Sequence, residues 1–174
     1  MSLILGLAFL RTESDGSVPA GAWFAQEMMQ RAWARAAGDE PWPWTDAWPI
    51  ARLTASDETS LIVLAGGSPS ALAFGPGHLG VSPMPGERGN CVFAGNGETH
   101  FRFLADLALG ERLSVELLDG AQHAFEIVDL DVVDARRASL ALDSDKPLLS
   151  LICSYPFDGS ESSLRYVVTA ARSG

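Results

Sequence analysis

The sequence contains few of the residues from which metal centres and disulfide scaffolds are built. Its 174 residues include two cysteines and three histidines. Cys91 and Cys153 are too few and too far apart for a disulfide framework or a zinc-binding pattern. The histidines have no further cysteine or histidine at the spacing that zinc ligands adopt. We therefore expect neither a bound metal ion nor a cofactor.

Basic residues are also scarce. The chain has 12 Lys and Arg against 22 Asp and Glu, so its formal net charge at pH 7 is −10, and the basic residues form no cluster. An acidic protein of this kind repels the phosphate backbone of DNA and RNA. We therefore expect no nucleic-acid partner.

The chain also lacks a long hydrophobic run. The apolar run at residues 3–10 ends at Arg11, whereas a helix needs about 20 apolar residues to cross a bilayer. It has no basic flank and no clear cleavage site, which argues against a signal peptide. Residues 1–18 are therefore interpreted as an N-terminal segment, either a truncated membrane anchor or a disordered or packed terminus.

The length of the chain suits one domain with a proper core, which we assign to residues 19–174. This domain is expected to begin with an amphipathic helix over residues 20–37. Phe24, Met28 and Ala32 recur at helical spacing and form an apolar stripe along it, with Ala25, Met29 and Ala36 beside it. We expect this apolar face to cover the edge of a β-barrel rather than a membrane.

Short strands bounded by turn residues are predicted for the rest of the chain. The eight predicted strands cover residues 50–54, 61–65, 71–74, 91–95, 113–117, 125–132, 148–153 and 164–168. A short helix within residues 101–107 follows the fourth strand. The predicted fold class is therefore mostly β, an eight-stranded barrel over residues 49–171 with one long helix in front of it.

Two local features of the predicted barrel can be located from the sequence. Asp119-Gly120 is a hairpin turn signal between the fifth and sixth strands. Phe125 and Ile127 lie on one face of the sixth strand, and the apolar phase then shifts to Val128. A shift of one residue in the alternation predicts a β-bulge or bend at this point.

Spacing alone offers one candidate nucleophile. Cys153 lies at the end of an apolar strand and just before a loop, where a thiol can be both fixed in place and reachable. Together with a histidine it could form a cysteine–histidine catalytic pair. The alternative is a buried structural cysteine, which is the usual environment of a free thiol.

Five stretches then occur in an order and at a spacing that fit the motifs of one family. They read GPGHL at 75–79, PGERGN at 85–90, AGNGETHFRFL at 94–104, SLICSYPFD at 150–158 and LRYVV at 164–168. One such motif is weak, but five in order are specific. From about residue 20 to residue 171 the chain resembles a sortase, specifically the type found in Gram-negative proteobacteria.

The resemblance implies a cysteine transpeptidase that cuts the sorting signal of a secreted protein and passes the acyl group to an amine. Such an enzyme uses a cysteine nucleophile, a histidine acid/base and an arginine that steadies the oxyanion. The family's arginine falls on Arg165. Its histidine falls on Asn96, and an ungapped comparison puts its cysteine on Ser154, with Cys153 at the family's threonine position.

These substitutions leave three hypotheses. The first is a pseudoenzyme that keeps the fold, Arg165 and a peptide-binding groove. The second is a working transpeptidase or peptidase with an altered centre, in which Ser154 or Cys153 acts with His100 as the base. On a helix, His100 would lie one turn from Asn96. The third is a decayed or engineered sequence without a function of its own.

The resemblance also implies a partner and a location. The partner is the peptide sorting signal of a secreted substrate protein. The location is the periplasmic side of the inner membrane, to which the family is tethered by an N-terminal helix. In this sequence such an anchor is missing or truncated, so contact with a membrane is expected only through the N-terminal segment.

Overall fold

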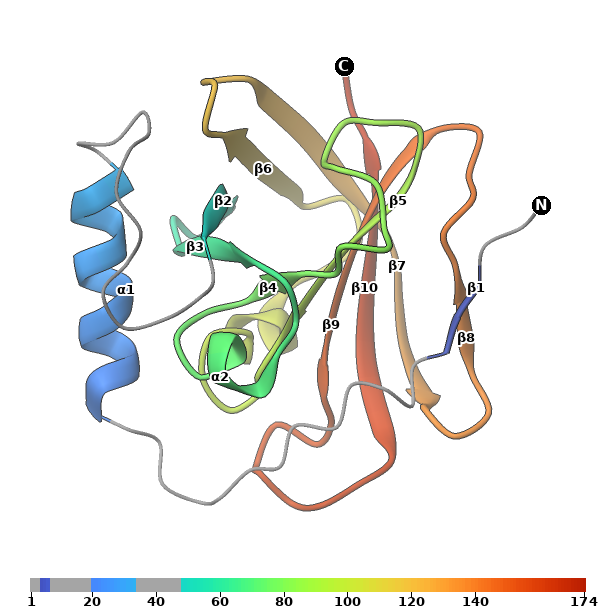
Figure 1. The fold of residues 1–174 in the computed structure, drawn as a ribbon. Helices are drawn as coiled ribbons and strands as arrows, with labels where there is room; N and C mark the ends of the chain where they lie inside the picture. The colour runs from blue at the N-terminus through green and yellow to red at the C-terminus, as the bar shows by residue number, and fades with distance from the viewer. Residues whose placement is uncertain (1–3, 7–19, 34–47) are drawn as a thin grey trace.

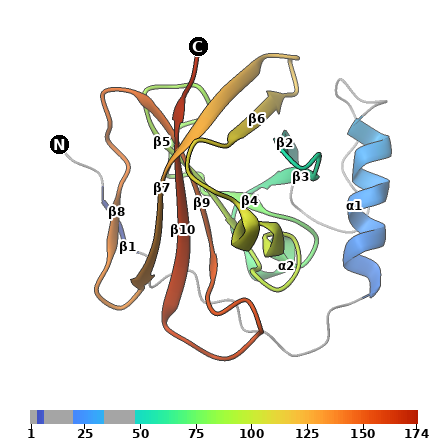
Figure 2. The same ribbon diagram turned by 180° about the vertical axis from the view of Figure 1, so that it is seen from behind.

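The computed structural model describes residues 4–6, 20–33 and 48–174, and within them eight strands form a closed barrel (Figure 1, Figure 2). Around the barrel the order is β10-β7-β6-β2-β3-β4-β5-β9. The strands are β2 (Pro49–Ala55), β3 (Ser60–Ala65), β4 (Gly77–His78), β5 (Gly89–Gly95), β6 (Arg112–Leu117), β7 (Gln122–Asp134), β9 (Pro147–Ser154) and β10 (Leu164–Arg172). The prediction of a mostly β, eight-stranded barrel is confirmed.

The remaining elements lie outside the barrel wall. Helix α1 (Ala20–Trp33) lies on one side of the barrel, and a two-stranded sheet of β1 (Ile4–Gly6) and β8 (Ser139–Ala141) lies on the other (Figure 1, Figure 2). The 3-10 helix η2 (Arg102–Asp106) confirms the predicted short helix. Among the described residues, no helix combines the length and the apolar character needed to cross a membrane.

The predicted third strand, residues 71–74, is wrong. Ala71 and Leu72 belong to helix α2 (Pro69–Leu72), whose N-cap Ser68 accepts a hydrogen bond from the amide of Ala71 at 3.2 Å, and residues 73 and 74 form a turn. A serine cap followed by proline at the first helical position favours a helix over an extended strand. The third strand of the barrel is instead β4, which lies between β3 and β5.

Helix α1 packs on strand β3, as a barrel-covering helix should. Ala25 and Met29 are buried against Ile62 and Leu64 of β3. Within the predicted apolar face, the side with Ala25 and Met29 is buried, whereas Phe24 is 62% exposed. Residues 34–37 of the predicted helix lie outside the described residues.

The polar side chain of Gln26 fixes the position of α1 on the barrel. Its Nε2 donates to the carbonyls of Ile62 and Phe74, at 3.2 and 2.9 Å, and its Oε1 accepts from the amide of Ile62 at 3.0 Å. Because both ends of this buried amide are paired, the helix is held in one register on β3.

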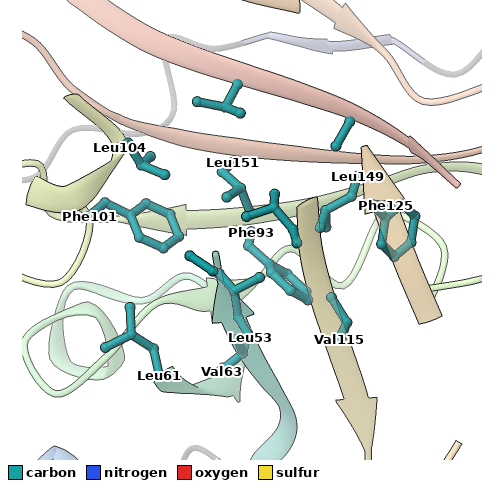
Figure 3. Close-up of a cluster of buried hydrophobic side chains, with 14 of the residues drawn as sticks. Leu53, Leu61, Val63, Phe93, Phe101, Leu104, Val115, Phe125, Leu149 and Leu151 are labelled. Carbon is teal, nitrogen blue, oxygen red and sulfur yellow. The ribbon is translucent and has the colours of Figure 1, made fainter. Parts of the chain in front are cut away.

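The barrel interior is filled by alternate residues of the strands, and Phe93, Phe125, Leu149 and Leu151 belong to this buried cluster (Figure 3). The predicted hairpin is present: Gly120 has φ +84° between β6 and β7. The predicted bulge is also present. On β10, the pairing partners of consecutive residues jump from Asp129 to Ile127, which leaves Val128 as the extra residue.

Candidate active site

The candidate site is assembled at the carboxyl ends of two parallel strands. Strands β5 and β9 pair in parallel, with Gly95 opposite Cys153, so the residues that follow them meet at the same edge. Strand β10 runs antiparallel to β9 and places Arg165 opposite Ser154. Asn96 is the first residue after β5.

The alternation of β9 separates its last two residues. Leu151 and Cys153 belong to the interior cluster, whereas Ile152 packs in a second cluster on the outer face of the wall. Side chains two residues apart on a strand share a face, so Ser154 continues the outer face of Ile152. Cross-strand partners also share a face, so Arg165 lies on the same side as Ser154.

A small pocket with a volume of about 10 Å³ lies at this edge. Its lining residues are Leu72, Ala94, Gly95, Ile152, Cys153, Ser154 and Arg165. The structure therefore brings Ser154 and Arg165 together, with Cys153 beneath them. Asn96 does not line the pocket. Elsewhere in the described ranges, no group of three or more His, Cys, Asp or Glu side chains converges as a metal site would require.

Arg165 is buried and is fixed by backbone carbonyls. Its side chain is 6% exposed, and Nη1 donates to the carbonyls of Ser162 at 3.2 Å and Leu164 at 2.7 Å. Burial lowers the pKa of this guanidinium, while the nearby Cys153 has the opposite effect. Arginine nevertheless keeps its charge in proteins, so the pocket contains a positive charge of fixed position.

The hydroxyl of Ser154 meets a backbone donor rather than a base. The amide of Gly97 donates to Ser154 Oγ at 3.3 Å. The side chain of Asn96 turns back into its own loop, where Oδ1 accepts from the amide of Glu98 at 2.7 Å. A neutral amide has no proton to exchange near neutral pH, and in this arrangement its oxygen is already used.

The alternative base and the alternative nucleophile are both buried. His100 is 9% exposed, and burial lowers its pKa to about 4. Its Nδ1 lies 3.3 Å from Thr99 Oγ1. Residues 97–101 form turns, so the helical spacing assumed between Asn96 and His100 is wrong. Cys153 is 2% exposed, and burial raises the pKa of its thiol to about 12 against the smaller, opposite effect of Arg165.

Sequence reasoning did not identify Gly97 or Gly159 as residues of this region. A Cβ atom on Gly97 would lie 2.5 Å from the carbonyl oxygen of Ser154. A Cβ atom on Gly159 would lie 2.6 Å from a carboxylate oxygen of Glu98. The one signal in the sequence came from the resemblance to sortases, because the family's motif usually has an arginine at the position of Gly97.

Comparison with known proteins now places the fold and the motifs in one family. The sequence model described as "Sortase domain" matches residues 54–173. The chain belongs to the sortase family. A curated relative, Sortase D of Bacillus subtilis (strain 168), is 32% identical over 114 residues. That match covers 64% of this chain and 57% of Sortase D, so the chain spans less than two thirds of this sortase.

Solved sortase structures share the fold. Sortase A from Corynebacterium diphtheriae has a TM-score of 0.70 at 23% identity, covering 99% of this chain and 76% of that one. A Sortase D5 transpeptidase from Clostridium perfringens has a TM-score of 0.65 at 17% identity, covering 88% of this chain and 98% of that one. At these identities the likeness shows the sortase barrel alone.

Proposed function

We propose that this protein is a non-catalytic member of the sortase family, which binds a peptide at the Ser154 pocket without transferring it. The observation that carries the proposal is the hydrogen bond from the amide of Gly97 to Ser154 Oγ. A hydroxyl becomes a useful nucleophile only when a base removes its proton. Here the hydroxyl accepts from a backbone amide, and no imidazole lies at the position of the family's histidine.

Each of the three histidines packs in surroundings of its own. His100 is buried beside Thr99. Nε2 of His78 lies 3.1 Å from the carbonyl oxygen of Pro83, within the loop that follows β4. The ring of His123 lies against Gly86, close to where a Cβ atom would be. General acid–base help is worth about 10²–10⁴ in rate, so its loss removes most of the turnover expected of a sortase.

Cys153 does not supply the missing chemistry. The thiolate, not the thiol, is the reactive form of cysteine. With a pKa of about 12, only about one thiol in 10⁵ is ionised at pH 7. The side chain is also 2% exposed and packs in the interior cluster. This favours the pseudoenzyme over a transpeptidase that uses Cys153 with His100.

The pocket retains features that suit peptide binding. Its floor is apolar, from Leu72, Ala94 and Ile152, and Arg165 places a positive charge beside it. Binding sites commonly combine an apolar lining with one or two fixed polar groups. The motif resemblance extends the proposal: the ligand is the sorting signal of a secreted protein, presented on the periplasmic side of the inner membrane of a Gram-negative cell.

The test uses the wild-type chain and a panel of sorting-signal peptides accepted by characterised sortases, with hydroxylamine as the acceptor. We expect intact-mass spectrometry to show no acyl adduct and chromatography to show no cleavage. An adduct on Ser154 or Cys153 would refute the non-catalytic assignment.

Binding is measured separately by calorimetry with the same peptides. We expect Arg165→Gln to weaken binding and Arg172→Gln, an exposed arginine on the same strand, to leave it unchanged. Absence of binding by every peptide at saturating concentration would refute the peptide-binding half of the proposal.

A further inference from the structure

Two loops contact each other beside Ser154. The first rim, residues 96–101, follows β5, and the second rim, residues 155–163, connects β9 to β10. Gly97 of the first rim contacts Ser154, the last residue of β9. Glu98 of the first rim contacts Gly159 within the second. We call these two contacts the Gly97 clasp.

The first contact is possible only because residue 97 has no side chain. A Cβ atom on Gly97 would lie 2.5 Å from Ser154 O, 3.2 Å from Ser154 Oγ and 3.3 Å from Cys153 Sγ. The nearest of these is a backbone atom of the barrel wall. Side-chain carbons do not approach backbone oxygen so closely, because interiors are packed at van der Waals contact. Any larger residue at 97 must lift the first rim.

The second contact also depends on glycine. Gly159 has φ +80°, a backbone conformation that side chains strongly disfavour. The carboxylate of Glu98 occupies the space that a Cβ atom of Gly159 would need, with its oxygens 2.6 and 2.9 Å from that position. The first rim therefore makes two contacts, one with the end of β9 through Gly97 and one with the second rim through Glu98.

The small volume of the pocket indicates that the Gly97 clasp restricts access to Ser154. The pocket has a volume of about 10 Å³, room for about one water molecule, whereas sites that hold drug-sized ligands enclose roughly 300–1,000 Å³. The closed arrangement leaves too little room for a peptide at Ser154. A ligand can therefore reach Ser154 and Arg165 only when the two rims have moved apart.

We propose that Gly97 is a positioning residue that holds the pocket closed, so that a peptide binds only when residues 96–98 lift away from Ser154. This inference rests on the proposed peptide-binding function and adds its regulation. The apparent affinity of a ligand falls by the fraction of molecules in the binding-competent state. A residue at 97 that forbids the closed state removes that penalty.

The experiment measures access to position 154 without a peptide. Ser154→Cys introduces a reporter thiol, and its alkylation by iodoacetamide is followed by peptide mapping from pH 6 to pH 11. Cys91 and Cys153 are buried, with 1% and 2% exposure, and the wild-type chain gives their background. The plateau rate at high pH reports access, whereas the midpoint of the profile reports the pKa of the thiol.

Adding Gly97→Ala is expected to raise the plateau rate about 10-fold or more, since the open form of such a two-state loop is commonly populated at roughly 10% or less. Gly80→Ala is the matched control, because its Cβ atom would meet nothing within 4 Å. An unchanged plateau, with or without a shifted midpoint, would overturn the proposal.

A second variant protects the test against misfolding. If circular dichroism shows that the Gly97→Ala chain is unfolded, Glu98→Ala in the Ser154→Cys chain replaces it, because that change loosens the second contact without a steric clash. A faster plateau supports the clasp, and an unchanged one overturns it. Failure here leaves the proposed function standing, since peptide binding and acyl transfer are measured on the wild-type chain.

Discussion

The burial of His100 makes the stability of this protein depend on pH. Burial lowers the pKa of this imidazole from 6.5 to about 4 in the folded chain. Between pH 6.5 and pH 4, His100 therefore binds a proton in the unfolded chain but not in the folded chain. Stability is fully present above pH 6.5 and is lost as the pH falls through this window. At 1.36 kcal/mol per pKa unit the loss amounts to about 3 kcal/mol.

The measurement compares urea unfolding of the wild-type chain and His100→Gln at pH 7 and pH 4. The variant is expected to lose about 3 kcal/mol less than the wild type over this interval. The other two histidines are present in both proteins, so their contributions cancel. Parallel losses in the two proteins, or an imidazole pKa above 6 by NMR, would refute the burial of His100.

The same pKa bears on catalysis. A general base works best when its pKa lies near the working pH. With a pKa of about 4, His100 is neutral at pH 7 but has little affinity for the proton of a serine hydroxyl. The second hypothesis, in which His100 replaces the family's histidine, is therefore weakened by the environment of His100.

Three further predictions concern named side chains. Gln26→Ala should lower the free energy of unfolding by about 3 kcal/mol, since it leaves buried backbone groups of the barrel unpaired. The control Gln30→Ala, at a half-buried position, should lower the free energy of unfolding clearly less in the same urea titration. Asn90→Ala should cost about 1–3 kcal/mol, because Asn90 is 3% exposed and pairs through both ends of its amide; an unchanged thermal midpoint would contradict this. Adding Asn96→His to Ser154→Cys should shift the midpoint of thiol alkylation to lower pH, and an identical midpoint would show that the two positions do not interact.

Features encoded by short-range patterns were predictable. The alternation of Leu113 and Val115 identified β6, and the change of apolar phase after Ile127 identified the bulge at Val128. Both depend only on which face of a strand each residue occupies. Seven of the eight predicted strands lie in barrel strands, whereas residues 71–74 do not, and β4 completes the barrel in their place.

The features that the sequence analysis missed have different causes, two of them local and one dependent on a distant partner. Residues 71–74 are apolar enough for a strand, but Ser68 caps a helix that includes Ala71 and Leu72. Strand β4 has two residues, too few to show a period. The role of Gly97 depends on Ser154, 57 residues later in the chain, and no local pattern reveals that contact.

The alternation along β9 has a consequence for engineering. Leu149 and Leu151 of β9 belong to the hydrophobic core. Ser154, in contrast, is half-buried at the end of β9, and Asn96 lies just beyond the end of β5. Substitutions outside well-packed cores usually change stability little. A combinatorial library at positions 96 and 154 should therefore yield mostly folded proteins, so that new chemistry can be selected on this barrel without rebuilding it.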